Sequence, residues 1–189
     1  ALLKMPAATR ASAEAWERPL FTFEGSGAAA QWQITNDGVM GGLSDGRFRI
    51  NDENNMEFYG TLSLENNGGF ASVRARGSNL GLSEGDAIVA RVRGDGREYN
   101  LNLYTPAGRM AFSYRAKFQT EKDQWTEIRI PVEEFVATSF GRVVNNLPLD
   151  PGEVNGLGIL LGDKKVGPFQ LEIDWIKVAK SIVSSVASR

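Results

Sequence analysis

Residues 56–64 read Met-Glu-Phe-Tyr-Gly-Thr-Leu-Ser-Leu, and apolar positions alternate with more polar ones along the whole stretch. A period of two predicts a β-strand that turns one face toward a core and the other toward solvent. The same period recurs in longer runs at 71–76, 99–104 and 112–118. Shorter runs fit the pattern at 20–23, 31–35, 47–50, 87–93, 125–130, 157–161 and 169–178. The dominant local structure is therefore the strand.

Turn-forming sequences separate these runs, as in Asn66-Asn67-Gly68-Gly69, Gly94-Asp95-Gly96 and Asp150-Pro151-Gly152. Ten or eleven short strands with regular turns predict an all-β sandwich or barrel. Helix is expected only as a turn around Glu133 to Phe135, or in the apolar stripe of the tail after Val178. With 189 residues and no internal repeat, we expect one β-sandwich domain over 19–178, an N-terminal arm over 1–18 and a C-terminal tail over 179–189.

The amino-acid composition excludes several kinds of catalytic and metal site. The chain has no Cys and no His, so thiolate nucleophiles, Cys-ligated metals and histidine-based acid–base catalysis are excluded. We therefore predict no enzyme, no catalytic residues, no cofactor and no metal site. The 21 basic and 23 acidic residues nearly cancel, which argues against general nucleic-acid binding. No run approaches the roughly 18 apolar residues of a membrane helix, so we expect the protein to be peripheral to a membrane at most.

The first 13 residues contain Lys4, Arg10 and five alanines but no acid. This composition is typical of a targeting-peptide remnant, and Ala11-Ser12-Ala13 has the small-x-small pattern of a processing site. It favours an organelle, mitochondrion or chloroplast, over the bacterial cytoplasm or periplasm. The alternatives are an unstructured arm and an extended arm that grips a partner.

The most distinctive string runs from Trp32 to Ser44 and has glycines at 38, 41 and 42. Glycines allow positive φ angles and close backbone approach. A nucleotide-binding loop would continue into a helix carrying Lys and Ser or Thr, but Asp45-Gly46 and another strand follow here. Two interpretations remain: a shaped loop between strands, or a contact with a ligand or partner, for which Asp37 and Met40 are the candidates.

Basic and amide side chains occupy the polar positions of several neighbouring runs. If those strands share one sheet, the period of two can put the side chains on one face. Arginine forks suit carboxylates and phosphates, so this face could dock an acidic protein segment or a polar ligand. The alternative is an ordinary solvated sheet face. The candidate partner-binding residues are Arg74, Arg76, Arg91, Arg93, Asn100, Asn102, Arg115 and Lys117.

The string Asn36–Ser44 closely resembles the signature of the complex I intermediate-associated protein family of the thirty-kilodalton type. The similarity continues through 58–63 and 66–74, and later through Gln119-Thr120, Ile130-Pro131, Gly158 and 167–176. It covers about residues 20–178. The resemblance implies a galactose-binding-domain-like jelly-roll β-sandwich and a non-enzymatic role, and it implies no catalytic residues.

In that family the mitochondrial member is an assembly factor that holds membrane-arm intermediates of respiratory complex I. Plastid and cyanobacterial relatives serve photosystem biogenesis. The resemblance thus favours an assembly factor or accessory subunit that binds protein subunits of a large energy-transducing membrane complex. The alternative is a carbohydrate- or small-ligand-binding module, in which Trp32, Trp125 and Trp175 could form a stacking platform.

Overall fold

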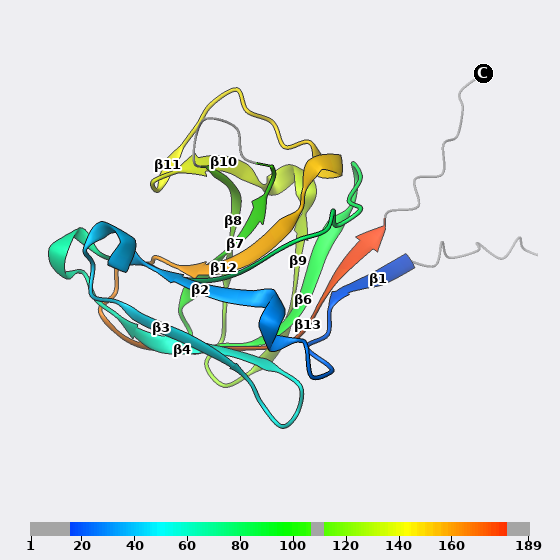
Figure 1. Cartoon of the computed structure of the whole chain (residues 1–189). Coiled ribbons are helices and arrows are strands. Elements are labelled where there is room, and N and C mark those ends of the chain that lie inside the picture. The colour runs from blue at the N-terminus through cyan, green and yellow to red at the C-terminus, as the bar shows by residue number, and fades with distance from the viewer. Residues whose placement is uncertain (1–15, 107–111, 181–189) are drawn as a thin grey trace, which may run out of the picture.

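Two antiparallel β-sheets lie face to face in the computed structural model, which describes residues 16–106 and 112–180 (Figure 1). Within these ranges every regular element is a strand or a short 3-10 turn. None of the helical turns is long and apolar enough to cross a membrane. The predicted all-β sandwich is confirmed.

The first sheet, sheet A, is built around one long strand. Its order is β3 (Asp45–Ile50), β4 (Met56–Leu62), β13 (Gly167–Lys180), β6 (Ala87–Arg93) and β9 (Trp125–Pro131), and β1 (Trp16–Phe21) also pairs with β13. The first half of β13 pairs with β4 and its end pairs with β1, so both strands lie on the side of β13 away from β6. A register shift between Ile173 and Trp175 separates the two halves.

The second sheet, sheet B, has the order β11 (Arg142–Val143), β10 (Val136–Ser139), β8 (Ser113–Gln119), β7 (Glu98–Tyr104), β12 (Gly156–Leu161), β5 (Ala71–Arg76) and β2 (Trp32–Asn36). Figure 1 shows β10 and β11 rising to one side of β12 and β2. The β10–β11 hairpin is not among the strands that alternation predicts. Its strands have only four and two residues, too few for alternation to identify them.

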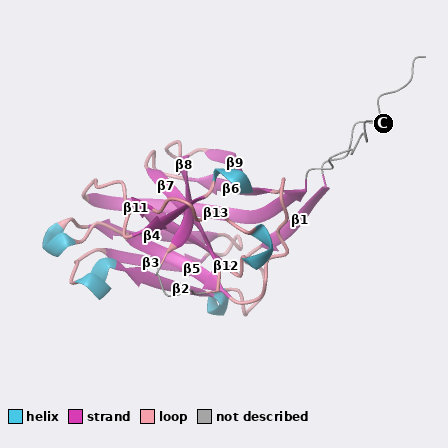
Figure 2. Ribbon diagram, turned by 90° about the horizontal axis from the view of Figure 1, so that it is seen from above, coloured by secondary structure: helices cyan, strands magenta, loops and turns pink. Residues whose placement is uncertain are grey.

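The 3-10 turns lie at the periphery of the sandwich (Figure 2). They are η1 (Ala29–Gln31), η2 (Asp37–Met40), η3 (Glu65–Asn67), η4 (Val132–Glu134) and η5 (Pro151–Glu153). The helical turn predicted around Glu133 corresponds to η4. Strands β1 and β13 extend into the residues that the sequence analysis gave to the arm and the tail. The apolar stripe expected at 182–186 and the first 13 residues lie outside the described ranges.

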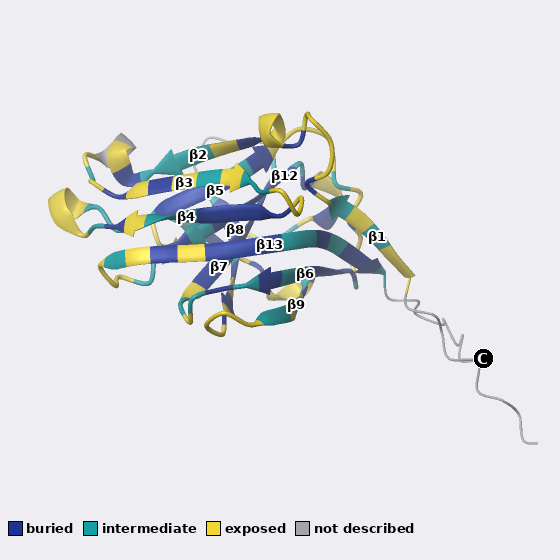
Figure 3. Cartoon of the chain, turned by 90° about the horizontal axis from the view of Figure 1, so that it is seen from below, coloured by how far each residue is buried: buried dark blue, intermediate teal, exposed yellow. Residues whose placement is uncertain are grey.

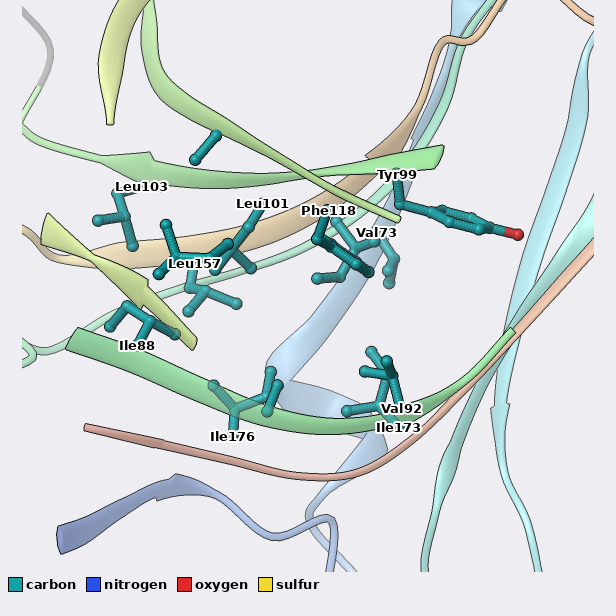
Figure 4. Close-up of a cluster of buried hydrophobic side chains, with 14 of the residues drawn as sticks. Val73, Ile88, Val92, Tyr99, Leu101, Leu103, Phe118, Leu157, Ile173 and Ile176 are labelled. Atoms are coloured by element: carbon teal, nitrogen blue, oxygen red, sulfur yellow. The ribbon is translucent and has the colours of Figure 1, made fainter. Parts of the chain in front are cut away.

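The core forms where the inner faces of the two sheets meet. Alternate residues of β5, β7 and β12 supply Val73, Leu101 and Leu157, which pack toward Val92 and Ile173 of sheet A (Figure 4). Figure 3 shows the burial along β4 and β13. The alternation of residues 56–64 arises because one face of β4 packs into the core, where Met56, Phe58 and Leu62 are fully buried. The outer faces are consequently left to polar side chains.

Candidate binding cleft

A cleft of about 540 Å³ is hollowed into the outer face of sheet B, on the side away from the core. Strand β5 contributes Arg74 and Arg76 to its lining, β7 contributes Asn102 and Tyr104, and β8 contributes Arg115. These five residues all lie at the outward positions of their strands. The cleft is larger than two other hollows of the described chain, which have volumes of about 390 and 290 Å³.

Strand register explains why these side chains share one face. Arg74 pairs with Gly158, Gly158 with Asn102, and Asn102 with Arg115. Residues that are directly paired in an antiparallel sheet point to the same side. Arg74 and Arg115 therefore face the same way across three strand spacings, about 14 Å apart at the backbone.

Two glycines of β12 make room for the larger groups. A Cβ added at Gly158 would lie 3.1 Å from the Tyr104 ring and 3.1 Å from the Arg74 Cβ. One added at Gly156 would lie 3.1 Å from the Arg76 Cγ. The guanidinium groups of Arg74 and Arg76 lie 5.3 and 4.8 Å from the centre of the Tyr104 ring, within cation–π distance. The glycines thus form the floor over which this stacked group lies.

The positive charges of the cleft lack carboxylate partners within the described chain. Arg115 donates from Nε to the Asn102 amide oxygen at 3.0 Å, and burial lowers the pKa of the Arg115 guanidinium. The Nε atom of Arg74 is buried without a hydrogen-bond partner. Lys164 adds a fourth cation, and the described lining contains no Asp or Glu. The cleft is therefore cationic although the whole chain carries a net charge of −2.

Five other arginines of the described chain are neutralised. Arg47, Arg49, Arg91, Arg93 and Arg97 all form ion pairs with carboxylates. Removing a guanidinium from water without a countercharge is costly. The cleft differs from these five sites in bringing three arginines together without a carboxylate.

The β10–β11 hairpin gives the cleft an apolar edge. Phe140 lines the cleft at the turn and is 80% exposed, and Val136 and Val143 on the flanking strands are 47% and 62% exposed. The pairing of Val136 with Arg115, and of Val143 with the cleft residue Thr138, places both valines on the cleft face. Phe140 also has a φ of +49°, a left-handed conformation that bulky side chains rarely adopt.

The Asn36–Ser44 string forms a loop next to the cleft, and its Asp37 side chain holds that loop in place by hydrogen bonds. The Asp37 carboxylate accepts hydrogen bonds from the Ser44 amide (3.0 Å), the Ser44 hydroxyl (2.6 Å), the Gly69 amide (2.7 Å) and the Phe70 amide (3.3 Å). Burial would raise the pKa of Asp37, but these hydrogen bonds bring it below its usual value. Asp37 therefore ties its own loop to the loop at 68–70, which borders the cleft.

The glycines of the string follow from the same carboxylate. A Cβ at Gly42 would lie 2.4 Å from the Asp37 Cγ, and one at Gly68 would lie 2.6 Å from its Oδ2. Gly41 has a φ of +85°. Asp37 itself is only 1% exposed, so the structure turns this candidate partner residue inward. The loop interpretation accounts for its role. The side chain of Met40 lies outside the description.

The eight basic and amide candidates fall into three groups: four line the cleft, two lie elsewhere on the outer face of sheet B, and two belong to sheet A. Asn100 and Lys117 share the outer face of sheet B but lie outside the cleft, and Lys117 pairs with Glu98 at 3.7 Å. Arg91 and Arg93 belong to β6 in sheet A, so the expectation of one common face is wrong for them. There they bracket the Trp125 ring and pair with Asp174 and Glu172.

The three tryptophans proposed as a stacking platform do not come together. Trp32 is 5% exposed and packs in the core against Phe21 and Phe23. Trp125 and Trp175 lie on strands of sheet A and are each covered by a cation from the same sheet. The described residues also contain no cluster of three or more carboxylates placed to hold a metal ion.

Sequence reasoning missed several residues at the cleft, and three of them matter most for its shape. Tyr104 ends an alternating run, and its position in phase with Asn100 and Asn102 could have assigned it to the same face. Gly158 was noted only as part of the family resemblance, although a Gly-x-Gly within a strand signals close approach by another group. Nothing in the sequence around Phe140 indicates a turn except the Phe-Gly dipeptide, because the strands on either side are too short to show alternation.

A family model described as complex I intermediate-associated protein 30 (CIA30) matches residues 21–173. The mitochondrial protein of that name from Mus musculus is 30% identical over 170 residues, which make up 78% of this chain and 52% of that protein. Its counterpart from Drosophila melanogaster is 26% identical over 183 residues, 83% of this chain and 61% of that protein. The chain thus spans less than two thirds of either relative. Both are named as mitochondrial, which supports the expected organellar localisation.

Solved structures show the same fold in unrelated sequences. The family 11 carbohydrate-binding module of a cellulosomal cellulase from Clostridium thermocellum has a TM-score of 0.67 at 15% identity, over 88% of this chain and 96% of that one. The agarase AgWH50C has a TM-score of 0.63 at 10% identity, over 87% of this chain and 24% of that one. These likenesses concern the sandwich alone. On the family match, which covers most of the chain, the protein belongs to the complex I intermediate-associated protein 30 family.

Proposed function

We propose that this protein is a non-enzymatic assembly factor or accessory subunit that binds protein subunits of respiratory complex I from the aqueous side of the membrane. The family match over residues 21–173 carries the proposal, and the curated relatives are named as mitochondrial complex I intermediate-associated proteins. The absence of His and Cys agrees with a role that needs binding and no reaction. Photosynthetic complexes are the second choice, because neither relative is named for one.

The structure supports a binding role for the sandwich itself. Its cationic cleft, with an apolar edge, offers both charge and hydrophobic area to a protein partner. The carbohydrate-binding alternative has only the shared fold in its favour. The one aromatic ring at the cleft floor, Tyr104, is covered by two guanidinium groups and so is poorly presented for stacking on a sugar.

Affinity purification tests the proposed function. The tagged full chain is expressed in cells of its own source, the membranes are solubilised gently, and co-purifying proteins are identified by mass spectrometry. We expect enrichment of complex I membrane-arm subunits over a purification with the tag alone. We also expect that depleting the protein lowers the amount of fully assembled complex I on native gels. Absence of complex I subunits, together with normal assembly after depletion, would refute the proposal.

A further inference from the structure

Three arginines facing one cleft without a countercharge indicate a ligand that brings its own negative charge. Arg115 is half-buried and its hydrogen-bond partner is a neutral amide. Arg74 has a buried donor atom without a partner, and Arg76 forms no ion pair with any described carboxylate. A bound carboxylate would satisfy these donors through paired N–H···O contacts, which the guanidinium fork favours.

The arrangement of the cations indicates the shape of that ligand. Arg74 and Arg115 lie in one cross-strand row, so their Cα atoms lie about 14 Å apart. An extended peptide advances about 3.3 Å per residue, so side chains roughly four residues apart would match the two positions and point to the same side.

The row continues into the apolar hairpin. Arg115 pairs with Val136 of β10, which is 47% exposed. Val143 pairs with Thr138, two residues further along β10, and both Val143 and Phe140 at the turn are largely exposed. A ligand that lies along the row therefore meets cations first and apolar surface last. This order fits a peptide with two acidic residues followed by an apolar one. A neutral glycan would leave the arginines without a countercharge, and an isolated anion would leave the apolar surface uncovered.

We propose that the sheet B cleft binds an extended acidic segment of a partner protein, with carboxylates paired to Arg74, Arg76 and Arg115 and an apolar side chain packed on the Phe140 hairpin. The inference rests on the proposed protein-binding function and names the surface and the partner chemistry for it. Arg74 and Arg115 are partly buried without a countercharge in the free protein, and the bound segment would supply one.

A labelled peptide of about ten residues tests the inference directly. It carries two glutamates four positions apart and a phenylalanine two positions beyond the second, and its control has glutamine in place of glutamate. We expect saturable binding of the acidic peptide by fluorescence polarisation, at least ten-fold weaker binding of the control, and weakening as salt rises. No binding, or equal binding of the two peptides, would overturn the inference.

Charge-removing variants locate the binding to the cleft. Arg74→Gln and Arg115→Leu should each raise the Kd for the acidic peptide about ten-fold. Arg129→Gln makes the same charge change on β9 of sheet A, where the side chain is exposed, and should leave the Kd unchanged. Weakening by Arg129→Gln equal to that by Arg74→Gln would contradict a cleft site.

Melting temperature separates binding from a structural role. Because Arg115 is a half-buried cation without a countercharge, Arg115→Leu should melt at the same temperature as the wild type or higher. A large fall in melting temperature would assign Arg115 to the fold and count against the inference. So would cleft-dependent binding of anionic lipid vesicles that exceeds the binding of the acidic peptide.

Co-purification distinguishes failure of the inference from failure of the proposed function. If Arg74→Gln and Arg115→Leu retain complex I subunits as well as the wild type does, the assembly role stands and the cleft inference is wrong. If the peptide binds in the cleft and no complex I subunit is ever recovered, the cleft inference stands and the proposed partner is wrong.

Discussion

Asp37 illustrates how one buried carboxylate can account for a whole sequence signature. Its four hydrogen bonds join the 37–44 loop to the 68–70 loop, and the glycines at 42 and 68 are needed because any side chain there would collide with it. The cleft arginines show the opposite situation, with donors left unsatisfied. Asp37 is thus explained by the fold alone, whereas the buried Nε of Arg74, which lines the cleft, is not.

Asp37→Asn should destabilise the protein by about 2–4 kcal/mol, because an amide cannot accept all four hydrogen bonds and the charge that strengthens them is lost. Since the folded-state pKa of Asp37 lies below its unfolded value of about 4, its contribution is present above that pH and disappears as pH falls through the folded pKa. Denaturant unfolding of both proteins at several pH values should show the difference shrinking in acid. A constant difference would contradict the assignment.

Two glycines of the signature provide a matched test of steric necessity. Gly42→Ala places a methyl group against the Asp37 carboxylate, whereas Gly38→Ala meets no atom within 4 Å. We expect Gly42→Ala to lower the free energy of unfolding by about 2 kcal/mol or more, and Gly38→Ala to change it by less than about 0.5 kcal/mol. Equal losses of stability for the two variants in thermal or denaturant unfolding would show that the close contact between residue 42 and the Asp37 carboxylate does not require glycine.

At the scale of elements, the β10–β11 hairpin combines poor turn chemistry with exposed apolar side chains. Phe140 and Gly141 form its two-residue turn with φ values of +49° and +76°. Positive φ at both positions is typical of a type I′ turn, in which Asn-Gly is the preferred pair. A phenylalanine at this position lowers the stability of the turn. Its presence is explained if the exposed ring contacts a partner protein.

Phe140→Asn should therefore stabilise the turn while damaging binding. The Asn-Gly pair should raise the free energy of unfolding by about 0.5–1 kcal/mol, measured by denaturant unfolding. The acidic peptide should bind several-fold more weakly, because the apolar contact at the end of the cleft is lost. Unchanged affinity would remove the hairpin from the binding surface, and lower stability would contradict the turn assignment.

At the scale of the molecule, charge is distributed unevenly between the two sheets. Sheet A pairs the outward arginines of β6 with carboxylates of β13, while sheet B leaves its cleft arginines unpaired. The buried pair of Arg97 and Asp163, 2.7 Å apart, joins the start of β7 to the β12–β13 connection. The outer face of β6 is thus neutralised within sheet A, whereas the cleft of sheet B gathers cations without carboxylates.

Salt should consequently affect partner binding more than folding. Raising the salt from about 0.1 M to about 0.5 M shortens the Debye length and screens the partly exposed cleft cations. We expect retention of partner subunits to fall over this range while the melting temperature of the isolated protein changes little. Retention that is independent of salt would point to a hydrophobic interface away from the cleft.

Local patterns determined much of this structure in advance. The alternation at 56–64 and in the runs like it identified the strands and hence the sandwich, because the period of side chains along a strand depends only on backbone geometry. The missing His and Cys limited the chemistry, and the string at 36–44 indicated the family. These features can be read from the sequence because each is contained within a few consecutive residues.

Only the tertiary structure decided which surfaces exist. Membership of a sheet is set by pairing between distant segments, so nothing in 87–93 revealed that β6 joins sheet A and carries Arg91 and Arg93 away from Arg74. The burial of Asp37 depends on amides about thirty residues further along the chain. The cationic cleft likewise arises because β5, β7 and β8 meet across the glycines of β12. Strand identity is local, whereas charge pairing and concavity require the whole fold.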